Sequence, residues 1–106
     1  MNLDDQRAEL KDVRRDVAER NQELANRVLD ARILRSRLEG EYRKGERGVM
    51  CSSQKAAEDA AKVDPEYLAH ERETARLTYE RDIAIADAES RAYGIQAALQ
   101  LAEVAT

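Results

Sequence analysis

The residues best suited to binding a ligand lie in one short run, GEYRKGERG, which starts at Gly40 and holds three of the chain's four glycines. Basic side chains beside an aromatic ring can hold a phosphate backbone and stack a base, which is how many proteins bind single-stranded nucleic acid. We therefore predict contact with single-stranded DNA through Tyr42, Arg43, Lys44 and Arg47 of this run and Arg35 before it.

This stretch is basic in an otherwise acidic chain. Residues 27–47 carry seven basic and four acidic side chains, whereas the whole chain has 18 basic against 22 acidic residues. After pairing with helical neighbours, Arg43, Lys44 and Arg47 are expected to remain uncompensated. Three such charges give only a weak, salt-dependent contact, and in a monomer an ordinary solvated helix end explains them better. Association of several copies would gather them into one basic surface.

No arrangement typical of an active site occurs in the sequence. The chain has a single histidine, His70, and a single cysteine, Cys51, so no histidine pair can form within it. The glycines 40, 45 and 48 match neither a phosphate-binding loop nor a dinucleotide fingerprint, because no strand precedes them. We predict a non-enzyme without metal, cofactor or small-molecule substrate, in which His70 is an exposed helical side chain.

Composition restricts the class of protein further. With 38% charged residues, four Tyr, no Trp and no Phe, the apolar volume must come from Leu, Ile, Val and Ala, which suits closely packed helices. The lone Cys51 fits a reducing, cytoplasmic compartment, and the acidic N-terminus does not resemble a signal peptide. The most apolar stretch, residues 83–105, contains four charged residues, so we predict a buried helix and no membrane contact.

The positioning elements are helical. Leu3, Leu10, Val17, Leu24, Ala31 and Leu38 recur at intervals of seven, the spacing of one seam of a coiled coil. The other seam positions are partly polar, which favours a bundle over an isolated two-stranded zipper. This pattern predicts one helix over about residues 3–44, and Gly45 is the expected residue just after its end.

A basic turn, residues 45–52, follows, and a serine at 52 or 53 is expected to cap a short helix over 53–63. In the next run, VDPEYL, Asp64 can serve as N-cap and Pro65 as first helical residue. A third helix is therefore predicted over about 65–104. The chain is expected to be a single all-α domain, 1–106, forming a long antiparallel helical hairpin.

The third helix is apolar on two faces, only one of which the first helix can cover. We therefore predict a homo-oligomer or a tight protein partner. The expected interface residues are Tyr79, Ile83, Ile85, Tyr93, Ile95, Leu99 and Leu101.

The layout resembles that of a known family. The runs LEGEYRKGERG, SSQKAAEDAAKVDPEY and AIADAESRAYGIQAALQLAEVA resemble the UvsY-like recombination mediators of tailed phages. The likeness spans most of the chain and rests on layout and composition. It implies rings of helical hairpins that bind single-stranded DNA and help to load a recombinase, with DNA contact at Arg43, Lys44 and Arg47.

Two functions from different classes follow. The first is an oligomeric accessory protein, such as a recombination mediator, that contacts single-stranded DNA through its basic turn. The alternative is a small helical adaptor or inhibitor that binds a protein partner through the apolar face of its C-terminal helix. A secreted hairpin with a Trp-x-Gly turn is a third class, which the absence of tryptophan disfavours.

Overall fold

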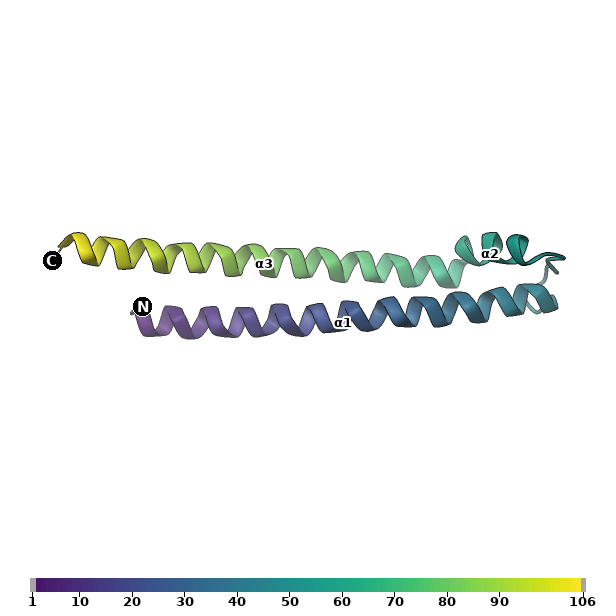
Figure 1. Cartoon of the computed structure of the whole chain (residues 1–106), viewed down its shortest axis with the longest axis horizontal. Helices are drawn as coiled ribbons and strands as arrows, with labels where there is room; N and C mark the ends of the chain where they lie inside the picture. The colour runs from purple at the N-terminus through teal and green to yellow at the C-terminus, as the bar shows by residue number, and fades with distance from the viewer. Residues whose placement is uncertain (1, 106) are drawn as a thin grey trace. The chain divides into compact units, whose positions relative to one another are not determined.

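The computed structural model describes residues 2–105. Three helices follow one another: α1 (Leu3–Lys44), α2 (Gln54–Lys62) and α3 (Pro65–Ala105), and no strand occurs in this range. Figure 1 shows the long helices α1 and α3 and the short α2 just before α3. The predicted all-α class is confirmed. The observed α2 is one residue shorter at each end than the expected helix.

The chain divides into two compact units, which are described separately. Unit 1 combines Met1–Gln22 with Thr78–Thr106, and unit 2 is Glu23–Leu77. Each unit contains a segment of α1 beside a segment of α3.

In unit 1 the two segments run antiparallel. Arg20 of α1 pairs with Glu80 of α3 at 3.2 Å, whereas Glu9, eleven residues earlier in α1, pairs with Arg91, eleven residues later in α3. In unit 2 the same order holds, because Arg27 bonds to Thr74 and Arg37 pairs with Glu66. The predicted antiparallel helical hairpin is confirmed within each unit.

The heptad leucines supply the core. Leu10 is buried in unit 1, and Leu24 and Leu38 are buried in unit 2, where Leu38 is fully enclosed. Burial of a leucine side chain stabilises a fold by roughly 2 kcal/mol. Ala57 and Ala61 of α2 are also fully buried, because their small side chains let the short helix approach closely. The predicted seam therefore faces the inside of each unit.

The polar residues of the same seam are used to join the helices. Arg20 lies between Asp16 of its own helix and Glu80 of α3. Arg27 donates hydrogen bonds to the Thr74 hydroxyl at 2.8 Å and to a backbone carbonyl of α3 at 2.9 Å. These positions weaken the apolar seam and replace it with cross-helix hydrogen bonds, which fix the register of α1 against α3.

Local capping explains where the short helix and α3 begin. Of the two candidate serines, Ser53 is the cap of α2, since its hydroxyl accepts the backbone N–H of Ala56 at 3.1 Å. Asp64 caps α3 by accepting the N–H of Glu66 at 2.9 Å, and Pro65 is the first residue of the helix. No helix within residues 2–105 combines the length and apolar character required to cross a membrane.

Helix α1 ends in a glycine-based cap. The N–H of Glu46 bonds to the carbonyl of Glu41 at 2.9 Å, and the N–H of Gly45 bonds to the carbonyl of Tyr42 at 3.3 Å, which together form a Schellman motif. Gly45 has a φ of +77°, a conformation that costs other residues about 1–2 kcal/mol. The predicted helix end at Gly45 is confirmed.

We expect Gly45→Ala to lower the free energy of unfolding by about 1 kcal/mol, because its backbone is left-handed, whereas the added Cβ would make only an ordinary contact with Met50 at 3.4 Å. Gly94→Ala is the matched control. Gly94 lies within α3, a Cβ added there would meet no atom within 4 Å, and the change should gain about 1 kcal/mol from helix propensity. Urea unfolding of dilute protein measures both, and equal effects of the two changes would contradict the role of Gly45.

Candidate interaction surfaces

A buried carboxylate organises the turn of unit 2. Asp64 is only 3% exposed, and its Oδ2 accepts the Tyr42 hydroxyl at 2.6 Å. Its Oδ1 accepts a guanidinium N–H of Arg47 at 2.8 Å as well as the N–H of Glu66. One side chain therefore joins the end of α1, the basic turn and the start of α3.

The pKa values of this cluster follow from its contacts. Burial alone would raise the pKa of Asp64, but hydrogen bonds from Tyr42, Arg47 and the Glu66 backbone outweigh burial and hold the pKa below its usual value. The hydrogen bond to Asp64 raises the pKa of both Tyr42 and Arg47. The carboxylate and the guanidinium therefore stay charged, and the phenol stays protonated, near neutral pH.

The expectation that Arg47 is uncompensated is wrong. Besides Asp64, its guanidinium lies 3.7 Å from Glu41 and 3.4 Å from Glu66. The physical reason is that the turn folds back towards the start of α3, where a buried carboxylate requires a counter-charge. Arg47 and Tyr42 thus hold the turn in place, and the Tyr42 hydroxyl is engaged within the chain.

The other predicted nucleic-acid-binding residues separate into two places. Arg43 and Lys44 are exposed at the end of α1, and no ion pair involves them within residues 2–105. Arg35 lies eight residues before Arg43, about 12 Å along the helix. It pairs with Glu39 at 3.4 Å and not with the turn.

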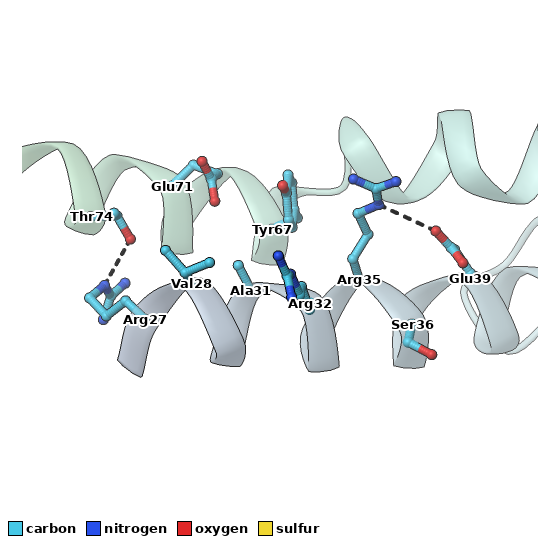
Figure 2. A pocket seen from close by; sticks show the side chains of 10 residues that line it. All are labelled: Arg27, Val28, Ala31, Arg32, Arg35, Ser36, Glu39, Tyr67, Glu71 and Thr74. Carbon is cyan, nitrogen blue, oxygen red and sulfur yellow. Dashed lines mark hydrogen bonds and ion pairs between the residues drawn. The ribbon is translucent and has the colours of Figure 1, made fainter. Parts of the chain in front are cut away.

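Arg35 instead lines a groove of unit 2 with a volume of about 560 Å³. Figure 2 shows Val28 and Ala31 of α1 pointing towards the helix that carries Tyr67 and Glu71 of α3, whereas Ser36 points away from it. The residues that line the groove are Arg27, Val28, Ala31, Arg32, Arg35, Ser36, Glu39, Tyr67, Glu71 and Thr74.

Most polar groups of this groove are already engaged. Arg27 bonds to α3, and hydrogen bonds to Glu39 and then to Tyr67 raise the pKa of Arg35. Arg32 is exposed at the groove and takes part in no ion pair within the described chain. Sequence reasoning missed Tyr67, although its place in the first turn of α3, opposite the arginines of an antiparallel helix, was a usable signal.

His70 differs from its expected exposed position. Its side chain is 16% exposed, and both ring nitrogens are buried without a hydrogen-bond partner in the described chain; Nδ1 lies 3.9 Å from Glu71. The cause is its place on the face of α3 that lies against α1, where Arg27 donates hydrogen bonds to the His70 carbonyl and to the Thr74 hydroxyl one turn later. No group of three His, Cys, Asp or Glu side chains within residues 2–105 could hold a metal ion.

The most exposed apolar surface is a strip on α3 in unit 1, here called the outer strip of α3. At 100° per residue its members fall within an arc of about 80°. Tyr79 is 67% and Tyr93 75% exposed, and Ile83, Leu101 and Val104 are also exposed. The strip comprises Tyr79, Ile83, Ala86, Ser90, Tyr93, Ala97, Leu101 and Val104.

The predicted interface set divides between two faces of α3. Tyr79, Ile83, Tyr93 and Leu101 belong to the exposed outer strip. Ile85 and Ile95 are half-buried, and Leu99 is 37% exposed. The last three lie outside the arc of the outer strip, and Ile95 lines a hollow with residues of α1.

We expect Asp64→Asn to lower the free energy of unfolding by about 2 kcal/mol, because the amide loses the charge-assisted bonds to Arg47 and weakens the cap of α3. Asp59→Asn on α2, whose side chain is 60% exposed, is the matched control and should change little. Chemical unfolding at neutral pH measures both.

The pH dependence has a defined sign. Because the folded pKa of Asp64 is lowered, its contribution is present above the unfolded value of about 4 and is lost as the pH falls through the folded pKa. The stability difference between the original chain and Asp64→Asn should therefore narrow as the pH drops below about 4. A difference that stays constant would contradict the role of the carboxylate.

Comparison with protein-family models, with curated proteins and with solved structures finds no match to this chain. Two kinds of surface thus carry the functional inference: the exposed cations at the end of α1 and the outer strip of α3.

Proposed function

We propose that the chain is a non-enzymatic interaction protein that binds another helix through the outer strip of α3. The observation that carries this proposal is the exposure of the strip, in which two tyrosines are each at least two-thirds accessible. Isolated exposed apolar residues are common on protein surfaces, whereas apolar residues that recur along one helix face, here interrupted by Ser90, mark an interaction site.

The spacing of the strip suits a helical partner. Its residues follow one another at alternating intervals of mostly three and four, which is the pattern that lets one helix pack along another. Tyrosine is also enriched at the centres of protein interfaces, because the ring supplies apolar area and the hydroxyl can remain hydrated. Burial at about 25 cal/mol per Å² makes each large side chain of the strip worth roughly 1 kcal/mol or more.

This proposal includes self-association and the helical adaptor as its two forms. Both use the same strip, and they differ only in which chain supplies the second helix. Helix α1 leaves the strip uncovered within unit 1, so the second helix has to come from elsewhere.

Contact with single-stranded DNA is a second candidate function. Its support is the exposure of Arg43 and Lys44 without an ion pair, with Arg32 unpaired further back on α1. Because Arg47 is bound to Asp64, each copy offers fewer free cations than the sequence alone predicts. Assembly through α3 would multiply those cations, which is the arrangement a recombination mediator that contacts a recombinase and single-stranded DNA would use.

The interaction function predicts a contact at a defined position. With a photoreactive benzoylphenylalanine at position 93 in place of Tyr93, irradiation of cells that produce the chain should give a covalent protein adduct. The same group in place of Asp12, an exposed residue away from the strip, should give little. An adduct of twice 12.0 kDa indicates a second copy, and another mass indicates a different partner. Absence of any adduct specific to position 93 would refute the interaction function.

DNA contact is tested with Arg43→Ala/Lys44→Ala, which leaves the Asp64 cluster intact. We expect binding of a labelled oligothymidine at low salt to weaken about three- to tenfold. The slope of the logarithm of the binding constant against the logarithm of the salt concentration should become shallower by about one or two. Lys55→Ala/Lys62→Ala removes two exposed lysines of α2 and serves as the control of equal charge. Fluorescence anisotropy measures both, and no binding at low salt, or an equal loss in the control, would exclude this contact.

A further inference from the structure

A second exposed strip lies on α1 in unit 2, here called the outer strip of α1. It consists of Ala25, Leu29, Ile33, Ser36 and Gly40, which fall within an arc of about 80°. Leu29 is 56% and Ile33 68% exposed, although both are large apolar side chains. The remaining three members are small, so another helix can approach this strip closely.

The charges beside this strip are positive. Arg32 flanks it on one side and Arg37 on the other, and both are exposed. Residues 25–44 contain six basic and three acidic side chains. Arg37 is shared with Glu41 and Glu66, whereas Arg32 has no ion pair in the described chain.

The charges beside the outer strip of α3 are negative. Asp82 and Glu89 flank it on one side and Asp87 on the other, and all three are exposed. Residues 78–105 contain five acidic and two basic side chains. The two arginines, Arg81 and Arg91, contact Asn21 and Glu9 of α1 and also pair with Asp82 and Asp87 of their own helix. Glu89 is the flanking carboxylate without an ion pair in the described chain, and the stretch as a whole remains net negative.

The charges beside the two strips favour some arrangements of two copies over others. Two outer strips of α3 placed face to face would bring acidic flanks together, which is unfavourable in either orientation. The outer strip of α1 instead has Arg32 on one side, without an ion pair in the described chain, and on the other side Arg37, which is paired with Glu41 and Glu66. Its five residues span about 24 Å of helix, which matches a 16-residue stretch of the longer α3 strip.

We propose that the outer strip of α3 in one copy packs against the outer strip of α1 in a second copy. This inference rests on the proposed interaction function and names its partner. Apolar side chains meet along the centre of the contact, and acidic residues of α3 face Arg32 and Arg37 at its edges. The acidic flanks also disfavour anionic partners at this face.

The helical glycines provide an independent observation. A Cβ added at Gly40 or at Gly94 would meet no atom of the chain within 4 Å. Glycine in a helix interior weakens the helix relative to alanine, and nothing within the chain requires it at either position. Gly40 lies in the outer strip of α1, where the backbone of a second copy can come close, whereas Gly94 lines the hollow between α3 and α1 within unit 1.

The contact joins two different surfaces, so after two copies pair, one of them still has a free outer strip of α1 and the other a free outer strip of α3. Such a heterologous contact repeats from copy to copy and gives either a closed ring or an open filament. The exposed Arg43 and Lys44 follow the outer strip of α1 directly on the same helix, so they recur at each successive contact. Assembly would thereby place repeated cations along one structure.

Charge reversal in two variants tests the pairing. We expect Asp82→Lys/Glu89→Lys and Arg32→Glu/Arg37→Glu each to weaken self-association about tenfold or more in sedimentation equilibrium, because like charges then face one another. An equimolar mixture of the two should regain association, since reversed α3 then meets reversed α1. Asp12→Lys/Glu19→Lys changes the net charge as much as the first variant, lies away from both strips and should retain association.

Two further measurements keep the inference testable if a reversal disturbs folding. Gly40→Ala should retain or increase helicity by circular dichroism while weakening self-association several-fold. The photoadduct formed from position 93 between two copies should map by mass spectrometry to residues 25–40 of the second copy.

The outcomes separate this inference from the proposed function. An adduct at position 93 with a different protein keeps the interaction function and overturns self-pairing. Any one of three results also overturns the pairing of α3 with α1. These results are a self-adduct that maps to α3, self-association that is unaffected by both charge reversals, and a mixture of the two reversed variants that fails to regain association. Loss of any adduct overturns the proposed function itself.

Discussion

A pair of helices can bury only one face of each helix, and this constraint governs the rest of the structure. Within each unit the buried face is the heptad seam, whose large enclosed side chains are Leu10, Leu24 and Leu38. Every further apolar residue of α1 or α3 has to lie at the edge of the seam or in solvent. The outer strips are therefore a consequence of two helices that are apolar on more sides than one neighbour can cover.

The thin core explains why polar contacts are prominent in positioning the elements. Arg27 joins α1 to α3 where the seam lacks an apolar residue, and Asp64 joins the end of α1, the turn and the start of α3. Such contacts are directional, so they define register more sharply than apolar packing does. They also engage cations that the sequence alone would assign to a ligand.

The features predicted correctly from the sequence are those set by neighbouring residues. The seven-residue repeat, the Asp64–Pro65 start of α3 and the Gly45 end of α1 depend on contacts within a few positions, and the structure contains all three. The Arg47–Asp64 pair joins residues 17 positions apart, and it depends on how the turn folds back. Sequence spacing carried no signal for that partner, nor for the inward direction of His70.

The difference between local and long-range contacts also distinguishes the outer strip of α3 from the exposed cations at the end of α1. A strip of apolar residues is a local property of a helix, so its exposure follows once the single covering helix is known. Whether a cation remains unpaired depends on the tertiary structure, because a carboxylate from a distant segment of the chain can neutralise it. The structure consequently reduces the free cations of the turn while it leaves the α3 strip exposed. Any nucleic-acid contact of the proposed kind would therefore have to derive its strength from the proposed assembly of several copies, because one copy offers few free cations.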